Sequence, residues 1–243
     1  MKLFAKTLMA VAALATFTAT GFGPIGASQA EQMKPMDMMM MQNGVDYMVT
    51  FQGMWNEKTH PYEYPSGGAL NPNGPHFSGL IGTTHNAGYM LFKEGMMPTP
   101  GLEKLSEEGA HSPLDMEIKQ AMMAGKAGMM FATDFFLDVN APKMFMVHAS
   151  NAHPLVSVIG MIAPSPDWFF GVYNVNLMPG GKWADKVEMM AYAWDAGSDD
   201  GMSYLAADMN ASPKKMTMMA KDKHFSMNGK PVAIGKFTFM KQK

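Results

Sequence analysis

The sequence has no cysteine among its 243 residues. This absence excludes a disulfide framework and a lipid anchor on an N-terminal cysteine, so burial of apolar side chains has to hold the chain together, with or without a metal ion. Arginine is absent as well, because all 19 basic residues are lysines. Nucleic-acid-binding proteins usually carry basic clusters and arginine side chains. We therefore expect no nucleic-acid partner.

Long apolar runs are also missing. The longest strongly apolar run, Leu155–Ala163, is far shorter than the roughly 20 residues that span a bilayer. Near the N-terminus, two lysines precede the short apolar stretch Leu8–Thr18, and small residues occupy positions 28 and 30. This pattern is typical of a signal peptide. We predict cleavage after residue 30 and an exported protein, periplasmic or secreted, with no transmembrane segment after cleavage.

The chain that remains after residue 30 has 17 lysines and 21 acids, for a formal charge of −4. Residues 31–44 are polar, methionine-rich and aperiodic, which predicts a disordered leader. Residues 45–243 are enough for one domain of ordinary size.

Methionine is abundant, with 31 residues that include the run MDMMMM over Met36–Met41. A thioether is a soft ligand that suits Cu(I), but methionine is also a flexible apolar filler of protein cores. We interpret as core filling the methionines that fall in strand patterns, which are Met144, Met146, Met161, Met189 and Met190. The run in the leader lies outside any periodic segment, so weak capture of Cu⁺ there remains a hypothesis.

Alternation of apolar and polar residues dominates the chain. In Val45–Gly53, Tyr47, Val49 and Phe51 share one side, which is typical of a half-buried strand. Further strands are predicted at Gly88–Phe92, Met129–Val139, Lys143–Ala149, Leu155–Ala163, Trp168–Leu177, Val187–Trp194, Lys215–Met219 and Val232–Met240. Short turns rich in glycine, proline and asparagine separate many of them. The pattern predicts an all-β fold, an antiparallel β-sandwich.

One or two short helices interrupt this pattern. Ser112 and Pro113 resemble an N-cap followed by a proline at the first helical position. Leu114 and Ile118 then recur on one face, and Gly125 is a suitable stop. A shorter helix is predicted at Leu102–Glu108.

Two acidic motifs follow predicted strands. The motif PSPDW carries Asp167, and DAGSDDG carries Asp195 and Asp199. Three carboxylates on one divalent cation leave room for carbonyl and water oxygens in the shell of six to eight that calcium takes. The alternative is that each aspartate caps a tight loop. The spacing excludes an EF-hand, since Ala206 stands where that motif has glutamate.

The chain resembles the N-terminal spondin domain family, found in extracellular-matrix spondins and in bacterial exported proteins. The resemblance rests on YMVTFQGMW, HFSGLIGTTHN, MIAPSPDWFFGV and DAGSDDG, and it covers about Asp46 to Met240. It implies a sandwich related to calcium- and lipid-binding domains. It also implies that Asp167, Asp195 and Asp199 are calcium ligands. His76 and His85 match family positions, and we interpret them as residues that hydrogen-bond and hold loops in place.

These observations favour a binding or adhesion module with structural Ca²⁺, whose partner is an unidentified extracellular or periplasmic protein or glycan. The alternative is a periplasmic methionine-rich copper protein on the same scaffold. Enzyme motifs are missing: no GxSxG elbow, cysteine nucleophile or phosphate-binding glycine loop occurs. We therefore expect no catalytic activity.

Overall fold

The computed structural model describes residues 44–67, 73–134 and 138–243. The predicted signal peptide and nearly all of the predicted leader lie outside the described residues and stay predictions. The described residues belong to one compact unit. Within the described residues, no helix has the length and apolar character needed to cross a membrane.

Antiparallel strands make up most of this unit. The strands are β1 (Gly44–Gly53), β2 (His76–Phe77), β3 (Ile81–His85), β4 (Ala127–Ala132), β5 (Pro142–Ser150), β6 (Leu155–Ala163), β7 (Trp168–Asn176), β8 (Lys186–Asp195), β9 (Met218–Met219), β10 (Ser226–Met227), β11 (Lys230–Pro231) and β12 (Gly235–Lys241). The main sheet has the order β4-β3-β6-β7-β8-β12-β1-β5, with β2 beside β6 and β9 beside β8, while β10 and β11 form a separate pair.

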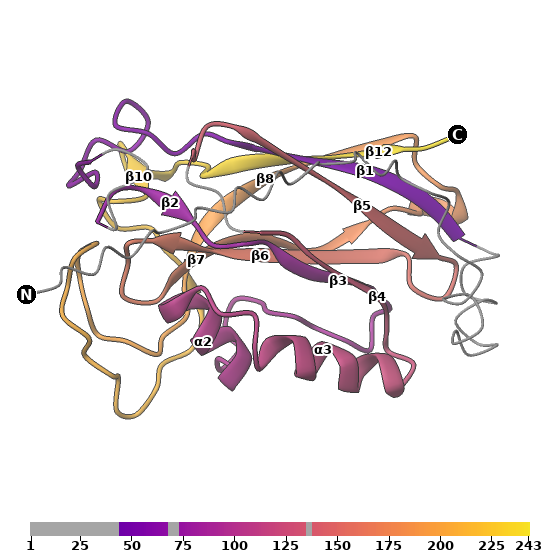
Figure 1. Ribbon diagram of the computed structural model, residues 1–243, viewed down its shortest axis with the longest axis horizontal. Coiled ribbons are helices and arrows are strands. Elements are labelled where there is room, and N and C mark those ends of the chain that lie inside the picture. The colour runs from indigo at the N-terminus through magenta and orange to yellow at the C-terminus, as the bar shows by residue number, and fades with distance from the viewer. Residues whose placement is uncertain (1–43, 68–72, 135–137) are drawn as a thin grey trace, which may run out of the picture. The chain divides into compact units, whose positions relative to one another are not determined.

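The main sheet bends back on itself, so that it forms two facing layers (Figure 1). One layer contains β4, β3, β6 and β7, and the other contains β8, β12, β1 and β5. The two ends of the strand order meet, because Phe131 of β4 stacks on Phe145 of β5 with ring centroids 5.2 Å apart. The predicted all-β, antiparallel sandwich is confirmed, in the form of a nearly closed sheet.

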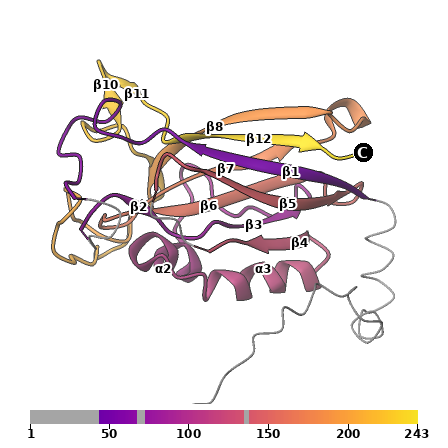
Figure 2. The ribbon, with the colours of Figure 1, turned by 45° about the horizontal axis from the view of Figure 1, so that its top comes forward.

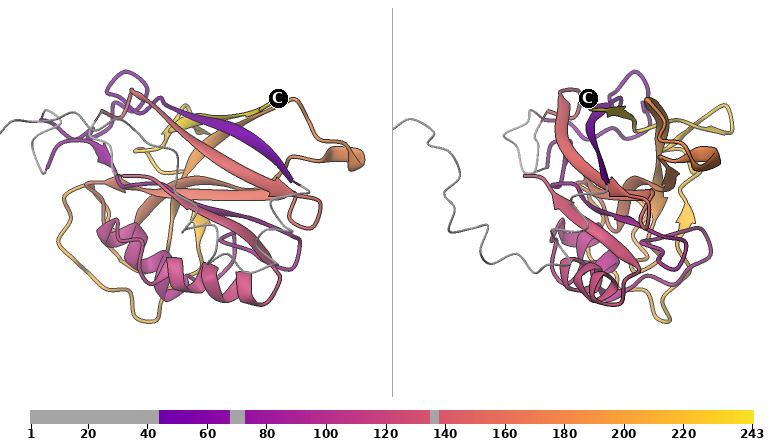
Figure 3. Two further views of the ribbon diagram at one scale, coloured as in Figure 1. Left: turned by 45° about the vertical axis from the view of Figure 1, so that its right-hand side comes forward. Right: turned by 90° about the vertical axis from the view of Figure 1, so that its right-hand side faces the viewer.

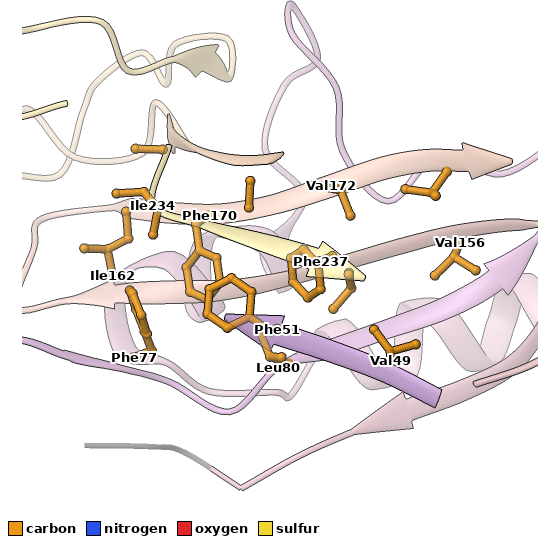
Figure 4. Packing of buried hydrophobic residues seen from close by; sticks show 14 of the residues in the cluster. Val49, Phe51, Phe77, Leu80, Val156, Ile162, Phe170, Val172, Ile234 and Phe237 are labelled. Atoms are coloured by element: carbon orange, nitrogen blue, oxygen red, sulfur yellow. The ribbon is translucent and has the colours of Figure 1, made fainter. Parts of the chain in front are cut away.

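The core lies between the two layers (Figure 4). The inward side chains of β1 are fully buried, as the alternation predicts. The Phe51 ring lies 4.9 Å from Phe170 and 4.7 Å from Phe237, centroid to centroid. Rings from both layers therefore meet at Phe51, and these ring contacts hold the two layers of the bent sheet against each other.

Two helices, α2 (Pro100–Glu108) and α3 (Leu114–Met123), cover the outer face of the layer that contains β3, β6 and β7 (Figures 2 and 3). Leu102 and Ile118 pack there against Phe169 and Trp194 in a second apolar cluster. β7 is consequently buried on both faces, which is why its sequence is apolar almost throughout.

The structure corrects several predicted strands. No strand occupies Gly88–Phe92; the strands of that region are β2 and β3, and Leu91 and Phe92 are buried in the cluster under the helices. Apolar burial without sheet pairing produced the same local pattern as a strand. Three other strands are shorter than predicted: β4 ends at Ala132, β9 has two residues, and β12 begins at Gly235.

The helix prediction was right about the segment and wrong about its start. α3 begins at Leu114, its N-cap is Pro113, and no side chain caps it. The predicted cap residue, Ser112, lies one position further out. α2 is capped as expected of a stable short helix, since the Thr99 hydroxyl accepts a hydrogen bond from the Leu102 amide at 3.1 Å.

Core filling is a wrong interpretation for most of the methionines in strands. Met161 is buried, but the exposed fraction is 59% for Met144 and 43% for Met146. Met189 and Met190 are also exposed, at 39% and 38%. For Met144 and Met146, period-two alternation marks one buried face and one solvent face without saying which face holds the methionines. Met189 and Met190 are consecutive, and both are exposed because β8 is exposed on both faces there.

The first prediction concerns the junction between the layers. Phe51→Ala should lower the free energy of unfolding by ~3–5 kcal/mol, because it removes a ring that contacts both layers. Urea denaturation measures this difference. The control is Thr50→Ala on the outward face of the same strand, which should change it by less than ~1 kcal/mol. Equal effects of the two substitutions would contradict this account of the core.

The second prediction concerns His60, which is 1% exposed. Burial disfavours the charged ring and lowers the pKa of His60 to about 4 from 6.5, against a smaller opposing effect of the Val232 backbone. The unfolded chain therefore binds the proton first, and stability falls as pH drops from 6.5 towards 4.

Urea denaturation of the wild type and of His60→Gln measures this effect. The wild type should lose ~2 kcal/mol more than the variant between pH 7.5 and pH 5. Taking the difference between the two chains cancels the contribution of every other titrating group. Identical pH dependence of the two chains would rule out the role assigned to His60.

Candidate functional site

Pairing of β7 with β8 brings the two acidic motifs together. Trp168, the first residue of β7, pairs with Asp195, the last residue of β8. The Ala196 amide donates to the Asp167 carbonyl at 3.2 Å. Asp167 and the DAGSDDG loop therefore lie at the same end of two neighbouring central strands.

Asp167 is fully buried. Its Oδ2 accepts hydrogen bonds from the Ser198 amide at 2.8 Å and the Asp199 amide at 3.1 Å. Its Oδ1 is also buried and has no hydrogen-bond partner within the described part of the chain. Burial, and then the negative charge of Asp195, raise the pKa of Asp167 to about 6, although the backbone amides oppose the shift. The site thus contains a carboxylate with one oxygen unsatisfied.

Asp195 is partly buried, and its Oδ1 accepts a hydrogen bond from the Gly197 amide at 2.8 Å. Burial raises the pKa of Asp195; the Gly197 amide and Lys215 act in the opposite direction, and Asp222 adds to the rise. Both Asp167 and Asp195 are therefore held under conditions that disfavour their negative charge, which is a property of sites that hold a cation or a proton.

Asp199 has a different environment. Its Oδ1 accepts from the Gly201 amide and its Oδ2 from the Met209 amide, both at 2.6 Å. It therefore closes the loop from residue 199 to residue 209, which is the loop-capping role that the sequence left open. The neighbouring Asp200 is partly exposed and pairs with Lys215 at 2.5 Å.

The three predicted ligands lie in one region but do not form a closed cage. Among residues 44–67, 73–134 and 138–243, no group of three histidine, aspartate or glutamate side chains is placed to hold a metal ion. Asp167 and Asp195 influence each other's charge, whereas both oxygens of Asp199 are occupied by the loop backbone. The buried, unsatisfied Oδ1 of Asp167, with Asp195 near enough for its charge to raise the pKa of Asp167, is thus the part of the prediction that the geometry fits best.

Glu107 on α2 joins this region, and sequence reasoning missed it. Its Oε1 is buried without a hydrogen-bond partner among the described residues. Burial raises the pKa of Glu107, the Ser198 hydroxyl lowers it, and the charges of Glu103 and Asp167 raise it further. No motif marks this residue, because only the packing of α2 on the sheet brings it to Asp167.

Two pockets flank the aspartates. A pocket of about 210 Å³ on the α2 side is strongly acidic, with the lining residues Glu107, Glu108, Ser165, Pro166, Asp199, Ala206 and Asp208. A pocket of about 400 Å³ on the other side has aromatic walls, with the lining residues Tyr62, Trp168, Asp195, Gly201, Met202, Asp222, Lys223 and His224. The sequence analysis predicted neither pocket.

His224 forms part of the wall of the larger pocket. Its Nδ1 lies 3.0 Å from Asp222 Oδ1, and its Nε2 lies 3.2 Å from Glu63 Oε2. Burial opposes a charge on His224, but the two acidic partners outweigh it and raise the pKa of the ring. The ring lies 4.9 Å from Tyr62 and from Trp168, centroid to centroid, so it fixes the aromatic wall.

The two histidines at family positions both make hydrogen bonds, as interpreted, but His85 joins two strands, β3 and β6, instead of holding a loop. His85 is fully buried; its Nδ1 donates to the Asn86 carbonyl at 2.9 Å, and its Nε2 accepts from the Ser157 hydroxyl at 2.8 Å. His76 Nδ1 donates to the Gly74 carbonyl at 2.9 Å. Neither ring lines either of the two pockets.

Comparison with known proteins places this architecture in a family. The family model described as Spondin_N matches residues 45–230. Human Spondin-1 is 31% identical over 177 residues, which are 71% of this chain and 20% of Spondin-1. Human Spondin-2 is 28% identical over 169 residues, 69% of this chain and 50% of Spondin-2. Rat Spondin-2 is 26% identical over 202 residues, 83% of this chain and 58% of its own.

The chain thus spans a fifth of Spondin-1 and about half of Spondin-2. The matched range begins with β1 and includes both acidic motifs, so it contains the site as well as most of the fold. The chain belongs to the Spondin_N family.

Proposed function

We propose that the protein is an exported binding or adhesion module in which a calcium ion fixes the loops at one end of the sandwich. The observation that carries the proposal is the fully buried Asp167, whose Oδ1 has no hydrogen-bond partner in the described part of the chain. A buried carboxylate is costly unless it is paired or binds a metal ion. Nothing in the sequence favours a catalytic role for it.

The surroundings of Asp167 favour a cation over a proton donor. Its charged neighbours Asp195 and Glu107 are both acids. The charge of Asp195 raises the pKa of Asp167, and the charge of Asp167 raises the pKa of Glu107. The charge of Lys215 lowers the pKa of Asp195, but the Lys215 side chain is 66% exposed and pairs with Asp200. Carboxylate oxygens are hard ligands, which suit Ca²⁺ rather than Cu⁺ or Zn²⁺.

The ligand set we propose keeps the three predicted aspartates and adds one residue. Asp167 supplies its unsatisfied Oδ1, Glu107 supplies its buried Oε1, and Asp195 supplies a carboxylate whose Oδ1 already accepts a hydrogen bond from the Gly197 amide. Asp199 joins through the second lone pairs of oxygens that already accept amide protons. Backbone carbonyls and water complete the shell of six to eight oxygens that calcium takes.

The larger pocket is the ligand-binding surface in this proposal. Its wall combines Tyr62, which is 39% exposed, with Trp168, and Asp195 joins it to the calcium site. Aromatic faces with adjacent polar groups bind sugars and protein side chains through stacking and hydrogen bonds. The partner is therefore an extracellular or periplasmic glycan or protein. Kinship with the spondins supports this assignment at the level of the fold.

The third prediction tests the ion. Calcium should raise the midpoint of thermal unfolding of the wild type relative to EDTA, because it binds the folded state alone. Asp167→Asn should abolish this rise. Asp200→Asn, in the same loop but paired with Lys215, should retain it. A wild-type midpoint that is the same in calcium and in EDTA would exclude the calcium site.

Without metal, the same substitution should stabilise the protein. The pKa of Asp167 is raised from 3.8 to about 6, so the folded state carries an electrostatic penalty at pH 7 that disappears below pH 3.8. Asparagine has no charge and still accepts the two amide hydrogen bonds. In EDTA at pH 7, Asp167→Asn should therefore raise the free energy of unfolding by up to ~3 kcal/mol. Destabilisation under these conditions would contradict the assigned cost of the charge.

The fourth prediction tests the binding surface. On an array of glycans and extracellular proteins, Tyr62→Ala should lower any specific signal of the wild type at least about tenfold, because it removes an aromatic wall of the pocket. Met116→Ala on α3 is the control, since Met116 is exposed and lies outside both pockets. Equal signals from Tyr62→Ala and the wild type would show that this pocket is not the binding surface.

A further inference from the structure

The outer face of the layer formed by β8, β12, β1 and β5 is rich in methionine. Residues that point inward from β1, such as Tyr47, Val49 and Phe51, are fully buried, so Met48 and Thr50 between them point outward. Met146 and Met240 are each 43% exposed. Helices α2 and α3 cover the outer face of the other layer instead (Figure 2). This face is therefore open to solvent at Met146 and Met240, and Met48 between them is partly buried.

Strand register places three of these methionines side by side. Met48 of β1 pairs directly with Met146 of β5 on one side and with Met240 of β12 on the other. Directly paired residues lie on the same face of an antiparallel sheet, with Cβ atoms ~5 Å apart. We name Met146, Met48 and Met240 the methionine row. Met144, 59% exposed, lies two residues from Met146 on the same face of β5.

Exposure is specific to methionine in this protein. Of the large apolar side chains that are exposed in the described residues, all but Tyr62 and Leu205 are methionines. Leucine, isoleucine, valine and phenylalanine lie mainly in the two apolar clusters. If methionine only replaced leucine as an apolar residue, leucine would be found in the same exposed positions. The property that distinguishes the exposed residues is thus the thioether sulfur.

We propose that the methionine row binds a soft monovalent metal ion, Cu⁺. Thioethers are neutral, soft ligands that prefer Cu⁺ to hard cations. Each methionine has three rotatable bonds, so the sulfur of Met48 and that of a neighbour at cross-strand spacing can turn to one ion. Met48 is the shared ligand, because it lies between the other two. The row ends at β8 with Lys186, which pairs with Met240 in register and forms an ion pair with Glu188 at 3.1 Å.

This site is independent of the calcium proposal. It uses sulfur instead of oxygen ligands, and no residue of the row lines either pocket beside the aspartates. It also differs from the Cu⁺ hypothesis for Met36–Met41, which lies outside the described residues. A folded sheet fixes the spacing of its side chains, whereas consecutive methionines in a chain cannot all turn to one ion.

The test uses the full chain labelled with ¹³C at the methionine methyl groups, with Ag⁺ as the probe and anaerobic Cu⁺ as the second titrant. The methyl signals of Met48, Met146 and Met240 should shift at lower Ag⁺ concentrations than those of Met116 and Met123 on α3. Met123 is 80% exposed, so it reports what an isolated surface thioether does. Signals of the row that shift together with those of α3 would overturn the proposal.

A matched pair of substitutions tests the shared ligand. Met48→Leu keeps an apolar side chain of similar size and removes the sulfur, and it should weaken Ag⁺ and Cu⁺ binding at the row at least about tenfold. Met123→Leu should leave it unchanged. Any binding by Met36–Met41 is common to both variants and cancels in the comparison. Unchanged binding in a folded Met48→Leu protein would overturn the assignment.

Discussion

Burial of β7 on both faces is the constraint on which the site depends. Trp168 and Phe170 pack into the core, while Phe169 packs against the cluster beneath the helices. A strand held on two sides cannot shift in register, so the residue that precedes it is fixed as well. Asp167 is that residue. Its carboxylate stays in a buried position, at an energetic cost, because moving it would expose the aromatic side chains that follow it.

The same constraint explains why loop capping is compatible with the ion site that we propose. Asp167 Oδ2 holds the Ser198 and Asp199 amides, and the carboxylate of Asp199 holds the rest of the loop. These hydrogen bonds order the loop without satisfying Asp167 Oδ1. A loop already ordered by backbone hydrogen bonds loses little conformational entropy when an ion binds. The two interpretations that the sequence left as alternatives are therefore compatible, because the ion that we propose would bind to a loop that hydrogen bonds have already ordered.

Sequence reasoning succeeded where local pattern and burial coincide. The alternation in β1 and the run in β6 predicted buried strands, because each has a regular apolar face. It failed at Leu91 and Phe92, which are buried without pairing in a strand, and at Glu107, which meets Asp167 only through the packing of α2. Local periodicity reports which side chains are apolar. It does not report which distant element covers them.

The two outer faces of the sandwich show why the methionine row was hidden in the sequence. Ile159 of β6 and Met146 of β5 are both apolar side chains on outer strand faces, yet Ile159 is covered by the cluster under the helices and Met146 is exposed. Covered faces select residues by shape, so branched and aromatic side chains fill them. An exposed face imposes no such selection, and its composition then reflects solubility or chemistry. Methionine adds little to solubility, and this is the reason why we propose a chemical role for the sulfur atoms of the three paired methionines.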